Sequence, residues 1–84
     1  MTLIHDTRDT PYTYKGETTT LPDYIAKVRK QLSLTQRQAA EIFGGGVTAF
    51  SRYEHGKIRP SLALVKLLKV LDRHPDLLAE IRMV

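Results

Sequence analysis

The chain has 84 residues and a formal net charge of +4 at pH 7, and 42% of its residues are hydrophobic. This length suits one compact domain with a short arm and excludes most enzyme folds, because a deep cleft needs a longer chain. The absence of cysteine excludes disulfides and thiolate metal sites, and no apolar run reaches the roughly 20 residues of a membrane span. We therefore expect a cytoplasmic protein with no cofactor, no metal and no membrane partner.

Residues 1–20 are predicted to form an N-terminal arm. Tyr12 and Tyr14 fall on one face of an alternating pattern, and Lys15-Gly16 follows them as a candidate turn. This pattern predicts a short β-hairpin or an extended segment. Because an isolated hairpin is only marginally stable in water, the arm must pack on the helices, pair with another chain or stay mobile. The residues leave these three alternatives open.

Residues 21–84 are predicted to fold as an all-α domain of five helices. The first helix covers about residues 22–31, because Pro22 suits a first helical turn and apolar residues then recur at helical spacing. The second helix begins after Thr35, which forms a T-x-x-Q capping box with Gln38. The residues expected to face inward from this helix are Ala39, Ala40, Ile42 and Phe43.

A tight turn and a third helix are expected next. Three consecutive glycines, residues 44–46, cannot continue a helix cheaply and can adopt positive φ angles, which predicts the turn. The third helix is expected to run from about Val47 to Glu54, with Phe50 and Tyr53 facing the core.

The last two helices carry more apolar residues than one face of a small domain normally buries. Ser61 caps the fourth helix, and the fifth covers about residues 75–82. The surplus predicts an interface with a second copy of the chain, although the same residues would serve equally well to close the core of a single copy. The expected interface residues are Leu77, Leu78, Ile81 and Val84.

Two short helices joined by a glycine turn inside a basic domain have the layout of a helix-turn-helix. Residues 21–84 hold eleven basic and six acidic side chains, a balance that suits a polyanionic partner. In the major groove, Arg52 would pair with guanine, Thr48 with a base edge and Val47 with a thymine methyl group. The predicted base-reading residues are Val47, Thr48, Ser51 and Arg52, although the pattern alone also fits an ordinary solvated helix face.

Four stretches form a specific set: Leu34-Thr35-Gln36, the glycine turn, Phe50 to Lys57 and Arg59-Pro60-Ser61. This set resembles the signature of the phage-repressor-like (Xre/Cro) helix-turn-helix family. Within that family, residues 27–82 closely resemble the C-terminal half of MqsA-type antitoxins. The resemblance implies a repressor that binds operator DNA on the nucleoid as a homodimer. It also implies the antitoxin of a type II toxin-antitoxin pair, repressing its own operon, with a cognate toxin as a candidate partner.

The resemblance also implies roles for individual residues. Gln36, at the start of the second helix, would contact a DNA phosphate. Arg29 and Glu54 match positions that pair with each other inside phage repressors. Lys57 and Arg59, in the loop after the third helix, would bind phosphates. MqsA-type antitoxins also carry a zinc-binding N-terminal half with paired cysteines; this chain has no cysteine, so no zinc site is expected.

A second hypothesis is a protein-interaction module. The N-terminal arm would then dock on a partner protein, with residues 18–20 adding a strand to the partner's sheet, and specific DNA binding would be weak or lost. An enzyme is not expected, because the sequence shows no nucleophile–base pair. The triple glycine also lacks the Lys-Ser or Lys-Thr that follows in a phosphate-binding loop.

Overall fold

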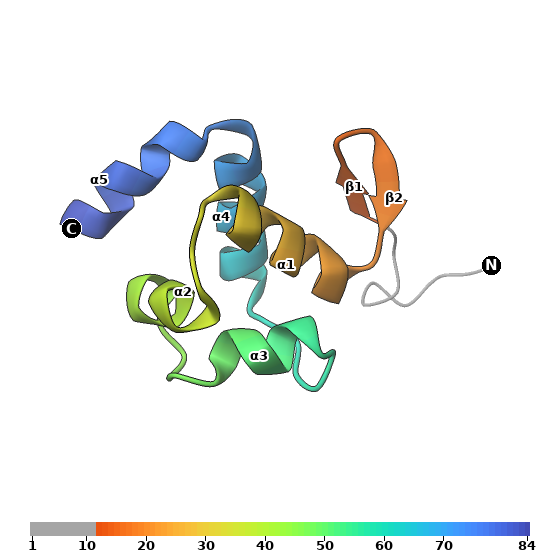
Figure 1. Cartoon of the computed structure of the whole chain (residues 1–84), viewed down its shortest axis with the longest axis horizontal. Coiled ribbons are helices and arrows are strands. Elements are labelled where there is room, and N and C mark those ends of the chain that lie inside the picture. Colours follow the sequence, from red (N-terminus) through yellow and green to blue (C-terminus); the bar gives the residue numbers. More distant parts are fainter. Residues whose placement is uncertain (1–11) are drawn as a thin grey trace.

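The computed structural model of this protein describes residues 12–84, which form a two-stranded hairpin followed by five α-helices (Figure 1). This agrees with the predicted all-α domain and its short N-terminal arm. The part of the predicted arm within residues 1–11 lies outside the described residues. None of the described helices is long and apolar enough to cross a membrane.

Three of the helices begin at residues whose side chains cap them. Thr20, Thr35 and Ser61 are N-caps, and each side chain accepts a hydrogen bond from the backbone N–H three residues further on. The capping box of Thr35 and Gln38 is complete in both directions. The helices are α1 (Leu21–Gln31), α2 (Gln36–Phe43), α3 (Ala49–Glu54), α4 (Leu62–Arg73) and α5 (Leu78–Met83), the last preceded by the 3-10 turn η1 (Pro75–Leu77).

The start of α3 differs from the prediction. Val47 and Thr48 belong to the turn that follows the three glycines, so the helix begins at Ala49 rather than at Val47. Thr48 is the N-cap residue, but its side chain makes no capping hydrogen bond. The prediction placed the helix start directly after the glycines, whereas the chain needs two further residues to reverse its direction.

The hairpin consists of β1 (Tyr12–Tyr14) and β2 (Glu17–Thr19), which pair antiparallel. Lys15 and Gly16 form the turn with φ angles of 50° and 84°. Two successive positive φ angles match the right-handed twist of the paired strands, which is why this type of turn suits two-residue hairpins. The arm is thus a hairpin rather than an extended segment over these residues.

The hairpin packs on the helices with its inner face. Tyr12 stacks on Tyr24 of α1, and the Tyr14 hydroxyl donates a hydrogen bond to Gln31 Oε1 at 2.7 Å. The outer face carries Thr13 and Thr18, which are paired across the strands and exposed. Of the three alternatives for the arm, packing on the helices is the one that residues 12–19 adopt.

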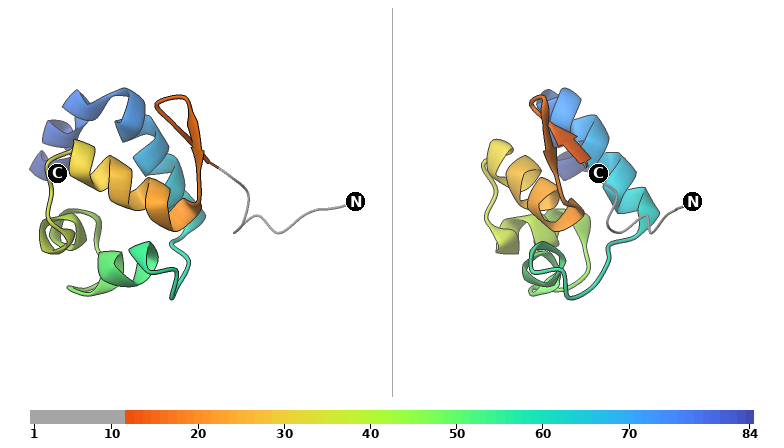
Figure 2. Two further views of the ribbon diagram at one scale, coloured as in Figure 1. Left: turned by 45° about the vertical axis from the view of Figure 1, so that its right-hand side comes forward. Right: turned by 90° about the vertical axis from the view of Figure 1, so that its right-hand side faces the viewer.

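The five helices enclose one core. Figure 2 shows α1 in the middle of the molecule, with the hairpin and α4 on one side and α3 on the other. Small buried side chains, including Ala39 and Ala49, lie on α2 and α3, where a close approach of two helices requires them. The largest fully buried side chains are Phe50, Ile25, Leu68, Leu71 and Val28.

Candidate nucleic-acid interface

The turn between α2 and α3 has a backbone conformation that favours glycine at three positions. Gly44, Gly45 and Gly46 have φ angles of 90°, 98° and 91°, which residues with a Cβ rarely adopt. A Cβ on Gly45 would also lie 2.9 Å from Ala49 Cβ and 3.2 Å from the Tyr53 hydroxyl oxygen. The first turn of α3 therefore sits directly against the backbone of this turn.

The helix that follows has a buried side and an exposed side. Phe50 is fully buried in the core. Arg52 is exposed on the opposite side, together with Thr48 at the N-cap, and Val47 in the preceding turn is 67% exposed. Three of the predicted base-reading residues thus present their side chains to solvent, and Thr48 and Arg52 are four residues apart on one face.

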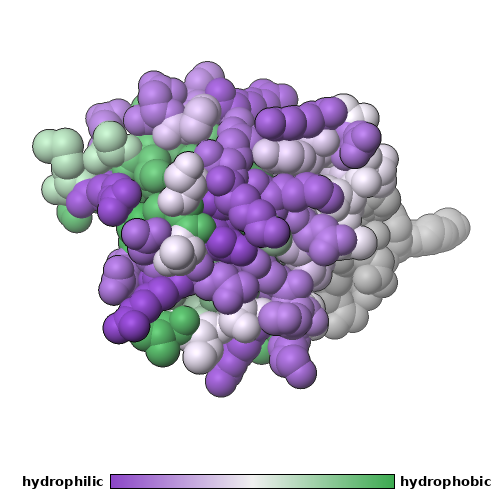
Figure 3. Space-filling view, in the orientation of Figure 1, coloured by the Kyte–Doolittle hydropathy of each residue, from purple (hydrophilic) through white to green (hydrophobic). Residues whose placement is uncertain are grey.

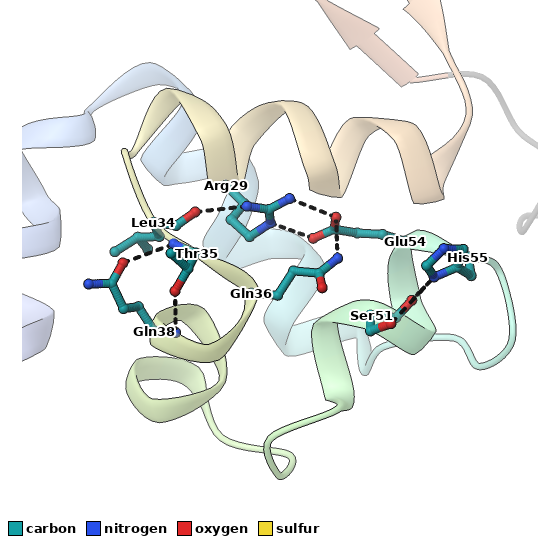
Figure 4. A network of polar contacts seen from close by, with 8 residues as sticks. All are labelled: Arg29, Leu34, Thr35, Gln36, Gln38, Ser51, Glu54 and His55. Atoms are coloured by element: carbon teal, nitrogen blue, oxygen red, sulfur yellow. Dashed lines mark hydrogen bonds and ion pairs between the residues drawn. The ribbon is translucent and has the colours of Figure 1, made fainter.

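Ser51, the fourth predicted base-reading residue, is half-buried and lies beside His55 (Figure 4). His55 Nδ1 is 2.7 Å from the Ser51 carbonyl oxygen and 3.4 Å from the Ser51 hydroxyl oxygen. A hydrogen bond to the carbonyl oxygen requires the proton on Nδ1. The structure therefore places His55 next to Ser51 at the exposed end of α3.

The end of α3 is a Schellman motif. Gly56 has a φ angle of 71°, its N–H donates to the Tyr53 carbonyl oxygen at 3.1 Å, and the Lys57 N–H donates to the Arg52 carbonyl oxygen at 2.8 Å. The motif reverses the chain and holds the backbone of Lys57 beside that of Arg52. Lys57 and Arg59 are both exposed in the loop that leads to α4.

Arg29 of α1 and Glu54 at the end of α3 form a bidentate ion pair (Figure 4). Arg29 Nε is 2.6 Å from Glu54 Oε2, and Nη2 is 2.9 Å from Oε1. The two side chains are only 11% and 8% exposed. Arg29 Nη1 also donates to the Leu34 carbonyl oxygen at 2.8 Å. Paired, planar hydrogen bonds of this kind fix geometry, so the pair fastens α3 to α1.

Gln36, for which the resemblance implied a phosphate contact, is half-buried and lies against Glu54. Its Nε2 donates to Glu54 Oε1 at 3.1 Å, so the amide is directed at the ion pair. Arg37, the next residue along α2, is exposed and was missed by the sequence analysis. The sequence carried a signal for this residue. The helix dipole disfavours a cation in the first turn of a helix, so a cation at that position indicates that an anion binds nearby.

The residues expected at a dimer interface lie on η1 and α5. Leu78 is 9% exposed and belongs to the core cluster of the single chain, where its side chain lies in the first turn of α5. Leu77 and Ile81 are partly buried against the same core, and Val84 is exposed. Figure 3 shows hydrophobic surface gathered on the side of the molecule where α5 lies.

A glycine turn between two short helices, an exposed polar face on the second helix and an ion pair behind it define a helix-turn-helix domain of the phage-repressor type. Residues 19–82 match the family described as the antitoxin component of bacterial toxin-antitoxin system, MqsA. The chain belongs to this family.

Two curated relatives are similar to this chain. Antitoxin MqsA of Escherichia coli (strain K12) is 64% identical over 64 residues, which cover 76% of this chain and 49% of that protein. Antitoxin HigA-2 of Vibrio cholerae (serotype O1) is 30% identical over 66 residues, which cover 79% of this chain and 64% of that protein. The chain thus spans about half the length of the first relative and less than two thirds of the second.

The zinc site that the resemblance implies for MqsA-type antitoxins uses paired cysteines. The sequence contains no cysteine. Among residues 12–84, no three or more His, Cys, Asp or Glu side chains are grouped so that they could hold a metal ion. Residues 12–84 therefore offer no set of side chains that fits a tetrahedral zinc site.

Proposed function

We propose that this protein is a sequence-specific DNA-binding repressor, the antitoxin of a type II toxin-antitoxin pair that represses its own operon. The observation that carries the proposal is the exposed face of α3, where Thr48 and Arg52 are four residues apart. The ion pair between Arg29 and Glu54 holds the buried side of this helix against α1. Membership of an antitoxin family supports it. The function is regulatory and requires no chemical step.

In the proposed complex, α3 lies in the major groove. Arg52 donates two parallel hydrogen bonds to O6 and N7 of a guanine, Thr48 bonds to a base edge, and Val47 contacts a thymine methyl group. These contacts would carry sequence preference, because each base pair presents a different set of donors, acceptors and methyl groups in the major groove. Ser51 is the least accessible of the four residues and would contribute least.

Exposed cations next to α3 would hold the phosphate backbone. Lys57 and Arg59 lie in the loop after α3, and Arg37 lies in the first turn of α2, whose start is bonded to the end of α3. Such contacts release counterions from DNA and make binding depend steeply on salt concentration. They would fix the register of the protein on the duplex without reading its sequence.

A homodimer would allow the protein to read two half-sites about 34 Å apart, one turn of DNA. The proposed interface consists of the hydrophobic surface at η1 and α5, with Leu77, Ile81 and Val84. Leu78 is left out because it is buried in the single chain. A cognate toxin is the proposed protein partner, and a repressor of this kind would act on the nucleoid in the cytoplasm.

The test is a fluorescence-anisotropy titration with DNA from upstream of the protein's own gene and a random duplex as control, at two salt concentrations. We expect a preference of about a thousandfold or more for the upstream DNA. The affinity for both duplexes should fall steeply as salt rises. Equal and weak binding to both would contradict the repressor and favour the alternative, a protein-interaction module that docks through the N-terminal arm.

A further inference from the structure

We infer that Gln36 is a positioning residue: by bonding to Glu54 it holds α2 and α3 at the angle that presents Arg52 to DNA. The inference rests on the DNA-binding function proposed above. The inference concerns the bond that the amide nitrogen of Gln36 makes inside the protein, and not the phosphate contact that the family resemblance implied.

The bond joins the two ends of the helix pair that lie farthest from the turn. The glycine turn connects the last residue of α2 to the first turn of α3, whereas Gln36 is the first residue of α2 and Glu54 the last of α3. At a rise of about 1.5 Å per residue, the two helices are about 12 Å and about 9 Å long. A bond between their far ends therefore restrains the angle between them more strongly than a contact near the turn.

The turn contributes no side-chain bond to this restraint. Its three glycines have no side chains to pack, and glycine has the widest range of backbone angles. The aromatic contact between the two helices, Phe43 against Phe50 with ring centroids 5.9 Å apart, lies near the turn. Within residues 12–84, the hydrogen bond from Gln36 to Glu54 is the side-chain bond that connects α2 to α3.

The acceptor of this bond is itself held in place. Glu54 is only 8% exposed, and both of its carboxylate oxygens accept hydrogen bonds from Arg29 of α1. Three helices thus meet at one carboxylate (Figure 4). Because the acceptor is charged and nearly buried, the bond from Gln36 is stronger than one between neutral groups in water.

The experiment compares Gln36→Met with the matched control Gln38→Met. Methionine has nearly the length of glutamine and lacks the amide. Gln38 lies on the same helix, and its side chain accepts a hydrogen bond from the Thr35 backbone N–H, so its loss weakens the helix start without touching α3. The affinities of both variants and of the unmodified protein are measured for the upstream duplex and for a random duplex.

For Gln36→Met we expect the affinity for the upstream duplex to fall about tenfold, the effect of one hydrogen bond to a charged group. Its affinity for the random duplex should stay unchanged, since the exposed cations remain. For Gln38→Met we expect an unchanged ratio of the two affinities and a thermal midpoint lower by about 4 °C. A parallel loss on both duplexes for Gln36→Met would identify a phosphate ligand and overturn the inference, as would unchanged affinity for both.

A measurement without DNA separates this inference from the proposed function. Residual dipolar couplings of the backbone amides report the angle between α2 and α3 in the free protein. We expect this angle to change, or to average over a wider range, in Gln36→Met and to be preserved in Gln38→Met. An unchanged angle in Gln36→Met would overturn the inference. If the unmodified protein does not distinguish the two duplexes, the DNA-binding proposal fails, whereas the couplings still decide the role of Gln36.

Discussion

The rings of Tyr12 and Tyr24 stack with their centroids 5.4 Å apart and 27° between their planes. This contact joins the hairpin to α1. The ammonium nitrogen of Lys69, on α4, lies 4.8 Å from the centroid of the Tyr12 ring, within the range of a cation–π interaction. One tyrosine side chain of the hairpin thus contacts two helices. We therefore expect the hairpin to fold and unfold together with them.

Replacing Tyr12 should test this expectation directly. Tyr12→Ala removes the stacked pair and the cation–π contact, and we expect the free energy of unfolding to fall by about 1–2 kcal/mol. Thr13→Ala is the matched control, because Thr13 is the next residue on the exposed face and should change stability by less than about 0.5 kcal/mol. Urea denaturation measures both values. Equal stabilities of the two variants would show that the hairpin does not support the helices.

The buried phenol of Tyr24 should make stability depend on pH at the alkaline end. Tyr24 is 3% exposed, and its hydroxyl donates to Asp72 Oδ2 at 3.0 Å. Burial raises the pKa of Tyr24 above its ordinary value of 10, and the hydrogen bond to Asp72 and the charge of that carboxylate raise the pKa further. The folded protein therefore keeps a proton that the unfolded chain loses above pH 10.

This contribution to stability is complete below the ordinary tyrosine pKa and is lost as the pH rises through it toward the raised value. In Tyr24→Phe we expect the free energy of unfolding to fall less steeply between about pH 9 and pH 11 than in the unmodified protein. Urea denaturation at several pH values gives the two slopes. The lysines and the other tyrosines are common to both proteins, so identical slopes would mean that Tyr24 does not titrate abnormally.

The glycine turn offers a way to separate backbone strain from a collision. Gly44→Ala places a Cβ in open space at a φ angle of 90°, so only the strain of about 1–3 kcal/mol applies. Gly45→Ala adds a Cβ 2.9 Å from Ala49 Cβ, a distance that forces the first turn of α3 to move. We expect Gly45→Ala to lower the free energy of unfolding more than Gly44→Ala, as measured by thermal denaturation. The reverse order would mean that α3 is not packed against the turn.

Arg52 and Lys57 should differ in how their loss affects DNA binding. If Arg52 reads a base, Arg52→Ala should cost about 1–3 kcal/mol on the upstream duplex and relax the sequence preference. Lys57→Ala should weaken binding to all sequences and reduce the slope of log affinity against log salt by about 1. Anisotropy titrations at several salt concentrations measure both effects. Equal losses on specific and random DNA for Arg52→Ala would rule out a base-reading role.

Sequence patterns predicted most helix starts because the signals are local. Thr35 and Gln38 satisfy each other's backbone donors within one turn, and the Ser61 side chain accepts from the Leu64 N–H at the start of α4, so no distant contact is needed to set these positions. The start of α3 was predicted two residues too early for a different reason. Three glycines predict a turn, but how many residues the turn consumes depends on where α3 packs.

The surroundings of two residues could not be predicted, because they depend on the rest of the fold. Leu78 looked like an interface residue, since an apolar stripe does not reveal whether it faces the core or a second chain. The amide of Gln36 bonds to a carboxylate 18 residues away, and no spacing along the chain predicts that contact. The exposed face of α3 could be predicted from the family motif because its buried residue, Phe50, sets which side turns outward.

The hairpin and α3 lie on opposite sides of α1 (Figures 1 and 2). The outer face of the hairpin, with Thr13 and Thr18, is exposed while its inner face is occupied by Tyr24. A protein bound to that outer face and a duplex bound to α3 would therefore not compete for the same surface. The geometry of a single chain permits a ternary complex in which the protein bridges its two ligands instead of exchanging one for the other.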